Sequence, residues 1–206
     1  MVDTRGDFFD VANVYLPIAC AVFGIVLVLV VYAMVFRRHR EPHDQRTEHT
    51  KIEAPYALLL VLVAAFLVAL TFSVEAKEDR VTGRPGLDLK VTAAQWNWRF
   101  DYPSYHISRL SSSSHEGSVV VPVDTPIHVR LTSADVIHAF YVPTTRFKRD
   151  AFPGSVTAFD LSFHTTGTYL GECAEYCGYL HSNMTFQVDV LSRPAFRTWV
   201  AAHRQP

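Results

Sequence analysis

Two long runs of apolar residues dominate the first third of the chain. Residues 14–36 form an uncharged stretch of 23 residues, and residues 54–74 form a second stretch of 21 residues. A helix rises about 1.5 Å per residue, so each run is long enough to cross the roughly 30 Å hydrocarbon core of a bilayer. The pattern predicts two transmembrane helices joined by a polar loop at 37–53, rather than two buried helices of a soluble protein.

The charges beside these runs predict how the helices are oriented. Residues 1–13 contain three acids and one base, so the first run lacks the basic start of a signal peptide and is also too long for one. The connecting loop carries five basic residues: Arg37, Arg38, Arg40, Arg46 and Lys51. By the positive-inside rule this loop is cytoplasmic, which makes residues 1–13 and 75–206 extracytoplasmic.

From about residue 75 the hydrophobic pattern changes to short, alternating or β-branched segments. Seven of them are separated by Pro, Gly and Asp turns: 87–101, 118–123, 127–132, 139–142, 156–163, 169–173 and 185–191. Strands at this spacing predict an all-β sandwich or barrel, followed by a short helix at 194–203. The serine run 111–114 is interpreted as a hairpin tip, and Trp96 and Trp98 as alternating positions of the first long strand.

The charge of this β region excludes one class of function. Residues 75–206 contain 13 Lys and Arg and 13 Asp and Glu, so the region has no net charge. A nucleic-acid partner would require a basic surface, which this composition does not supply.

The candidate chemistry is concentrated in one stretch of 12 residues. It contains Cys173, Cys177, His181 and Met184. Thiolate and thioether are soft ligands and imidazole is borderline, a combination that favours copper over calcium, magnesium or manganese. The C-x3-C spacing matches neither a zinc knuckle nor a c-type haem attachment site. His138, about 35 residues upstream at the start of an apolar strand, is the best further ligand.

Simpler interpretations exist for several of these residues. Cys173 and Cys177 outside the cytoplasm are able to form a disulfide, although it would close a very small loop and leave His181 and Met184 unexplained. His138 alone would be an ordinary buried histidine. Cys20, inside the first apolar run, is interpreted as a small packing residue.

With the two-helix hairpin, these motifs resemble subunit II of cytochrome c oxidase, in the haem–copper oxidase family. Further similarity lies in the stretches 95–98, 148–154 and 167–173, and the resemblance covers residues 13–191. It implies an N-terminal transmembrane hairpin followed by an all-β cupredoxin-like sandwich with a binuclear copper centre, CuA.

The resemblance also implies a role for each residue of the metal loop. Cys173 and Cys177 would bridge two coppers, of which one also binds His138 and Met184. The other would bind His181 and the backbone carbonyl of Glu175. The Glu175 carboxylate would reach a magnesium ion shared with subunit I, the alternative being a solvated loop residue.

Three residues outside the copper loop receive roles in the same way. Trp96 would accept electrons from a c-type cytochrome, with Asp135 as an acid at the rim of the docking surface. Glu53 would help admit protons on the cytoplasmic side, the alternative being an ordinary residue at a helix start. Electrons would leave near His181 for a low-spin haem of subunit I, where oxygen is reduced to water with proton pumping. Subunit III and membrane lipid are further expected partners.

Other functions are compatible with parts of this pattern. A quinol oxidase subunit II lacks the copper ligands found here, and a nitrous oxide reductase needs a large additional propeller domain. A membrane-tethered copper carrier is the alternative from another class. We do not favour it, because a buried two-copper cage would release metal slowly and a carrier needs no tryptophan pair.

Overall fold

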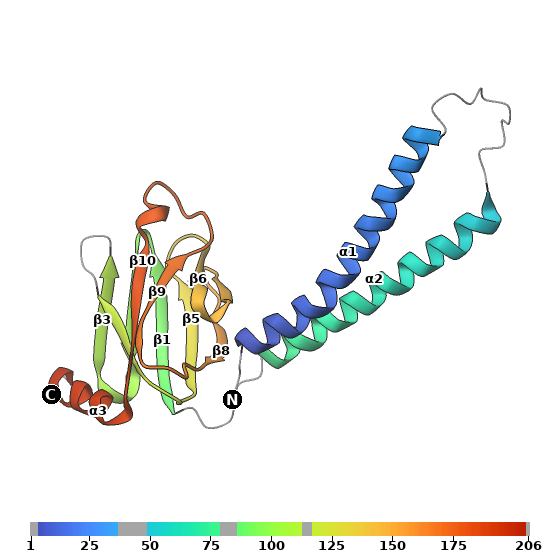
Figure 1. The fold of residues 1–206 in the computed structure, drawn as a ribbon. Helices are drawn as coiled ribbons and strands as arrows, with labels where there is room; N and C mark the ends of the chain where they lie inside the picture. Colours follow the sequence, from blue (N-terminus) through green and yellow to red (C-terminus); the bar gives the residue numbers. More distant parts are fainter. Residues whose placement is uncertain (1–3, 37–48, 79–85, 113–116, 205–206) are drawn as a thin grey trace. The chain divides into compact units, whose positions relative to one another are not determined.

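The computed structural model describes residues 4–36, 49–78, 86–112 and 117–204. The chain divides into two compact units, a helical one at residues 7–75 and a β domain that includes residues 76–206. Figure 1 follows the chain through both of them.

The helical unit contains two long apolar helices, as predicted. Helix α1 spans Thr4–Phe36 and helix α2 spans Thr50–Glu78. Both extend beyond the uncharged runs, so that α1 includes most of the segment 1–13 and α2 includes Lys51 and Glu53 from the predicted loop. The four arginines of that loop, at 37, 38, 40 and 46, lie outside the described residues.

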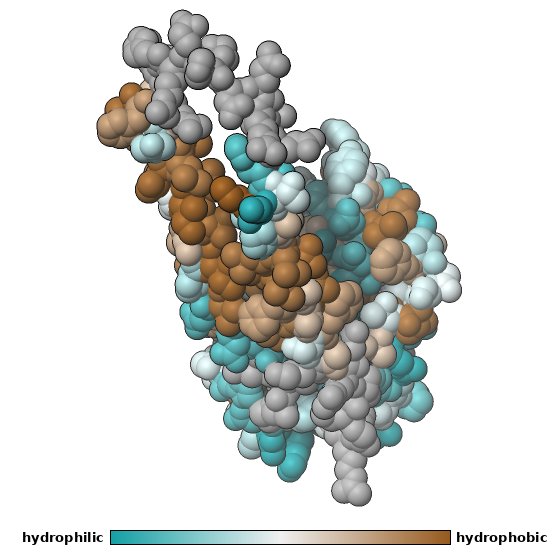
Figure 2. Space-filling view, turned by 90° about the vertical axis from the view of Figure 1, so that its right-hand side faces the viewer, coloured by the Kyte–Doolittle hydropathy of each residue, from teal (hydrophilic) through white to brown (hydrophobic). Residues whose placement is uncertain are grey.

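Both helices are apolar enough to cross a membrane. The most apolar 18-residue windows within Gly6–Phe36 and Thr50–Ala76 have mean hydropathies of 2.9 and 2.8, and no part of either window is buried. On the face shown in Figure 2, hydrophobic side chains gather over the helical unit. Such a surface is stable in lipid and unstable in water, which supports the transmembrane prediction.

The side chain of Tyr15 on α1 forms polar contacts with α2. The hydroxyl of Tyr15 donates a hydrogen bond to the carbonyl of Leu67 at 2.9 Å, and it lies 2.6 Å from Oγ1 of Thr71. Polar contacts of this kind hold helices together in lipid, where there is no hydrophobic drive between them.

The second unit is a sandwich of two five-stranded sheets. The first contains, in spatial order, β3 (Ile107–Ser112), β2 (Asn97–Tyr102), β1 (Leu87–Ala94), β5 (Ile127–Ser133) and β8 (Thr157–Leu161). The second contains β4 (Ser118–Pro122), β10 (Thr185–Leu191), β9 (Gly167–Cys173), β6 (His138–Val142) and β7 (Phe147–Ala151). Neighbouring strands are antiparallel except β1 with β5 and β4 with β10. The all-β prediction is confirmed.

The structure corrects three details of the sequence interpretation. The predicted strand 87–101 is a hairpin, because the chain turns at Gln95 and Trp96 between β1 and β2. Strands β3 and β7 were not predicted. Ser111 belongs to β3 and is buried, so the serine run is not simply a hairpin tip; Ser113 and Ser114 lie outside the described residues.

Large aromatic side chains fill the space between the sheets. Trp98 from the first sheet is fully buried and packs edge-on against Phe186 of the second, with ring centroids 5.4 Å apart. Phe186 in turn stacks on Phe140 at 4.9 Å. Trp98 also contacts the ring of His138 at 6.2 Å, so this part of the core supports one end of the sandwich directly.

A tyrosine links the first sheet to the backbone of the second. The hydroxyl of Tyr102 donates to the carbonyl of Val120 at 2.9 Å and accepts from the Val120 amide at 2.8 Å. Tyr102 also packs on Trp199 of helix α3 (Arg193–His203), which Ser192 caps. The predicted terminal helix is confirmed.

Candidate metal centre

Two neighbouring strands anchor the cysteine loop at both ends. Cys173 is the last residue of β9 and Met184 immediately precedes β10. The Cys173 amide donates to the Met184 carbonyl at 3.0 Å, and the Ala174 amide donates to the carbonyl of Ala139 at 3.1 Å. The second bond joins the loop to β6 one residue after His138. The fold therefore fixes the loop at both of its ends.

The donor atoms of all six predicted copper ligands converge inside this loop. The sulfurs of Cys173 and Cys177 are 3.8 Å apart. The sulfur of Cys177 lies 3.5 Å from Nδ1 of His181 and 3.8 Å from the Met184 sulfur. That of Cys173 lies 3.8 Å from Nδ1 of His138 and 3.2 Å from the Glu175 carbonyl oxygen. The two cysteine sulfurs thus lie at the centre of the six donors, and each sulfur has two further donors within 3.8 Å.

These six donors, called the cage below, are shielded from solvent on their inner side. His138 and Met184 are completely buried, and Cys177 and Cys173 are 3% and 6% exposed. All three cysteines of the chain are free thiols, so Cys173 and Cys177 form no disulfide here. Cys20 is exposed on the surface of α1, so it is not the packing residue we expected within this chain.

The electrostatics of the two thiols differ. Burial opposes ionisation of Cys173, but its hydrogen-bonding contacts with the His138 ring and with the Ala139 backbone outweigh this effect and lower the pKa of the thiol. Burial and the nearby charge of Cys173 raise the pKa of Cys177. A bound cation favours the thiolate form of both. Two thiolates, two imidazoles, a thioether and a carbonyl form a donor set that suits copper, so the residues fit the implied centre.

Asp135 orients one of the candidate ligands. Nε2 of His138 donates to Oδ1 of Asp135 at 2.9 Å, because a carboxylate only accepts. In the neutral imidazole this hydrogen bond leaves Nδ1 of His138 unprotonated, and Nδ1 is the nitrogen that faces Cys173. Burial would lower the pKa of His138, but its contacts with Cys173 and Asp135 raise it. We assigned Asp135 only to docking; its position three residues before His138 was the available signal for this second role.

Trp96 lies in the turn between β1 and β2 and not in a strand. Its ring is half-buried and contacts Gly178, the residue after Cys177. Trp98, two positions later, is the tryptophan that enters the core. The structure therefore brings Trp96 against the backbone of the cysteine loop.

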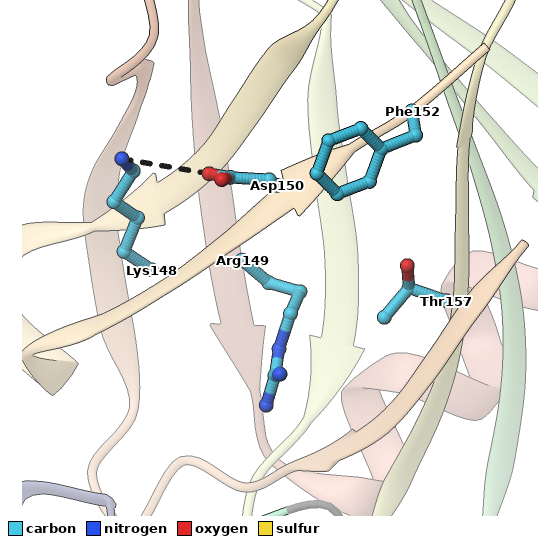
Figure 3. Close-up of a pocket in the computed structure, with 5 residues that line it drawn as sticks. All are labelled: Lys148, Arg149, Asp150, Phe152 and Thr157. Carbon is cyan, nitrogen blue, oxygen red and sulfur yellow. Dashed lines mark ion pairs between the residues drawn. The ribbon is translucent and has the colours of Figure 1, made fainter. Parts of the chain in front are cut away.

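The side chain of Glu175 points away from the cysteine sulfurs. Its carboxylate is 45% exposed and pairs with the Lys148 ammonium at 3.3 Å. Lys148 also pairs with Asp150 at 3.4 Å, and both line an open pocket of about 320 Å³ with Arg149, Phe152 and Thr157 (Figure 3). None of these five residues is a predicted copper ligand, so the pocket is separate from the cage.

Glu53 belongs to the helical unit and lies in the first turn of α2. Its carboxylate accepts a hydrogen bond from the His49 amide at 2.9 Å. A side chain that satisfies a free amide at a helix start stabilises that helix, which gives Glu53 a structural role whatever else it does.

Comparisons with known proteins agree with this geometry. Residues 87–191 match the family described as cytochrome C oxidase subunit II, periplasmic domain. The chain is 30% identical to cytochrome c oxidase subunit 2 of Branchiostoma floridae over 201 residues, covering 90% of this chain and 84% of that one. It is 26% identical to the probable cytochrome c oxidase subunit 2 of Rickettsia prowazekii, covering 95% of this chain and 67% of that one.

Solved structures show the same fold. The periplasmic domain of cytochrome oxidase subunit II from Bradyrhizobium japonicum superposes with a TM-score of 0.56 at 32% identity. The match covers 60% of this chain and 96% of that domain. Together with the family match, the buried His–Cys–Cys group and the two apolar helices, this similarity shows that the chain belongs to the cytochrome c oxidase subunit II family.

Proposed function

We propose that this chain accepts electrons from a c-type cytochrome at a binuclear CuA centre and passes them to the low-spin haem of subunit I. The observation that carries the proposal is the convergence of the six donors on the Cys173 and Cys177 sulfurs. Subunit I would then reduce oxygen to water and pump protons. Subunit III is a further partner in the assembled oxidase.

The chain's contribution is a rigid site. When bound, the copper pair supplies reversible one-electron transfer without bond chemistry. Cys173 and Cys177 would share both metals, His138 and Met184 would complete one, and His181 and the Glu175 carbonyl the other. Because the Cys173–Met184 and Ala174–Ala139 hydrogen bonds close the loop, these ligands have little freedom to move when the charge changes. Such preorganisation keeps the cost of each electron transfer low.

Electrons would arrive through Trp96. Its contact with Gly178 places an aromatic ring between the surface and the loop that holds Cys177. The proposed docking surface includes Trp96 and the exposed edge of Asp135. The carboxylate of Asp135 is already engaged by His138, and the domain carries no net charge, so we expect weak electrostatic steering of the donor.

Two acids are proposed to act at the boundaries of the subunit. The Glu175 carboxylate, which faces away from the sulfurs, would bind magnesium together with subunit I, exchanging its Lys148 partner for the cation. Glu53 would assist proton uptake on the cytoplasmic side. The two helices would cross the cell membrane, with residues 37–53 cytoplasmic and the β domain extracytoplasmic.

The decisive experiment is copper loading of the purified full chain in detergent. We expect two coppers per chain, a purple colour and an electron spin resonance spectrum of one electron shared by two metals. His138→Ala should lower the stoichiometry or remove the shared-electron signal, whereas His164→Ala, at an exposed histidine outside the cage, should change neither. One copper per wild-type chain, or a single-copper blue spectrum, would exclude the CuA assignment.

A further inference from the structure

We propose that Gln95 is a positioning residue that holds the Trp96 ring against the copper loop. The inference rests on the proposed function, since it concerns the path by which electrons would reach the cage. Gln95 would not contact the metals. The distance between the Trp96 ring and the loop depends on the Gln95 side chain.

The first contact runs from the Gln95 side chain to the cysteine loop. Nε2 of Gln95 donates to the carbonyl oxygen of Cys177 at 2.7 Å. The two residues are 82 positions apart in the chain, and this bond joins the β1–β2 turn to the backbone of a proposed bridging ligand. A side-chain amide is well suited to this position, because the carbonyl needs a donor and a carboxylate would repel it.

The second contact runs from the Gln95 backbone to the other side of the cage. The Gln95 amide donates to Oδ2 of Asp135 at 2.7 Å, while Oδ1 of Asp135 accepts from His138. The turn that carries Trp96 is therefore connected to two proposed ligands. The Gln95 side chain connects it to Cys177, and the Gln95 amide connects it to His138 by way of Asp135. Substituting the Gln95 side chain removes the first connection and leaves the second.

The Trp96 ring has no hydrogen bond of its own to fix it. Its Nε1 is buried, and within the described part of the chain it meets no acceptor. The ring position must therefore come from packing and from the residues on either side of it. Gln95, the immediate neighbour with two hydrogen bonds to the cage, is the residue best placed to supply it.

Gly178 completes the contact from the side of the loop. It has φ of +117°, a conformation that residues with a Cβ rarely adopt. A Cβ added there would lie 3.0 Å from Nε2 of Gln95 and 3.3 Å from Cζ2 of Trp96. Both side chains thus lie closer to this backbone than a Cβ at position 178 would normally allow, and a side chain there would push them away from the loop.

The test uses the assembled oxidase containing the full chain, with the substitutions Gln95→Ala and Gln95→Glu. Two coppers and an unchanged spin resonance spectrum are expected, with electron transfer from the reduced c-type cytochrome slowed about 10- to 100-fold. The KM for the cytochrome should change little, and reduction of copper by a small-molecule reductant should keep its rate. Asn97→Ala is the control, since the Asn97 side chain makes no hydrogen bond within the described residues.

A second measurement follows the ring itself and needs no copper. In the full chain labelled with 5-fluorotryptophan, the Trp96 fluorine signal, assigned through Trp96→Phe, should shift or broaden in both Gln95 variants. The Trp98 and Trp199 signals should not move. Gly178→Ala, which displaces the ring from the other side, should affect the same signal.

The outcomes separate the inference from the function on which it rests. An unmoved Trp96 signal with an unchanged rate overturns the positioning role, and so does loss of copper in Gln95→Ala, which would make Gln95 a structural support of the cage. Failure of the wild-type chain to bind two coppers overturns the proposed function instead. A normal rate in Trp96→Phe, with copper intact, removes Trp96 from the electron path.

Discussion

Asp135 and His138 face each other at 2.9 Å, and this contact directs the opposite nitrogen of the imidazole at Cys173. The two oxygens of Asp135 accept from four groups: the His138 ring, the backbone amides of Val136 and Gln95, and, at 3.4 Å, the Ser133 hydroxyl. In Asp135→Asn one of these oxygens becomes an NH2 group that meets a donor. We expect copper affinity to fall about 10- to 100-fold, the usual effect of disturbing the partner of a metal-bound histidine. Competition with a copper chelator measures it.

Asp124→Asn is the matched control for this substitution. Asp124 pairs with His164 at the same distance of 2.9 Å, but both residues are exposed and neither is a proposed ligand. Copper affinity should be unchanged in this variant. Equal affinities for the two asparagine variants would contradict the orienting role of Asp135.

A methyl group at Gly171 should destabilise the β domain. A Cβ at this position would lie 2.1 Å from the ring of Phe186, which is buried and packed between Trp98 and Phe140. Gly171→Ala is expected to lower the free energy of unfolding by about 1–3 kcal/mol, as overpacked cores do. Denaturant unfolding of the chain measures the change.

The same clash predicts non-additivity between Gly171 and Phe186. Phe186→Leu removes ring atoms and opens a cavity, so the single substitution should also be destabilising. In the double variant the new methyl group occupies part of that cavity. Its loss of stability should be smaller than the sum of the single losses, and strict additivity would argue against the contact.

The hydroxyl of Tyr15 should contribute to pairing of the two membrane helices. Tyr15→Phe removes the hydrogen bond to Leu67 and the contact with Thr71. Interhelical hydrogen bonds in membranes contribute about 0.6 kcal/mol on average, so a loss near this value is expected in detergent-driven unfolding of the hairpin. Tyr32→Phe should have no effect, because Tyr32 is exposed and its hydroxyl has no partner within the described residues.

Substitution at Glu175 should separate the role of its backbone carbonyl in copper binding from the role of its carboxylate in magnesium binding. Glu175→Gln keeps the carbonyl that lies 3.2 Å from the Cys173 sulfur, so copper stoichiometry should be unchanged. It weakens the pair with Lys148, but both side chains are nearly half exposed, and unfolding should change by less than about 0.5 kcal/mol. Metal analysis of the assembled oxidase should show less bound magnesium. Loss of copper in this variant would mean that the carboxylate supports the cage.

Much of the fold could be predicted from hydrophobic periodicity. Where the prediction was wrong, the error has a physical explanation. The run 87–101 looked continuous because neither central residue of the turn, Gln95 or Trp96, is a Gly, Pro, Asn or Asp. A signal was nevertheless present: buried positions are odd-numbered up to Ala93 and even-numbered from Trp98. Strand β7 was missed because three charged residues occupy its centre, between the buried Phe147 and Ala151.

The ligand set was easier to predict than the residues around it. Five of its six members lie within residues 173–184, four of them with chemically distinctive side chains, and the fold brings His138 to them. The contacts of Gln95 with Cys177 and of Lys148 with Glu175 join residues 82 and 27 positions apart. No local pattern encodes such pairings, because they depend on how the loops at one end of the sandwich meet.

Tyr102, which forms hydrogen bonds with both backbone groups of Val120, protects the protein against aggregation through its sheet edge. Strand β4 is the outermost strand of its sheet, and an outermost strand with free amides and carbonyls is a template for aggregation. Tyr102 occupies the amide and the carbonyl of Val120 from the side, and Trp199 packs on Tyr102. A foreign β-strand therefore cannot extend the sheet at this position without first breaking two buried hydrogen bonds.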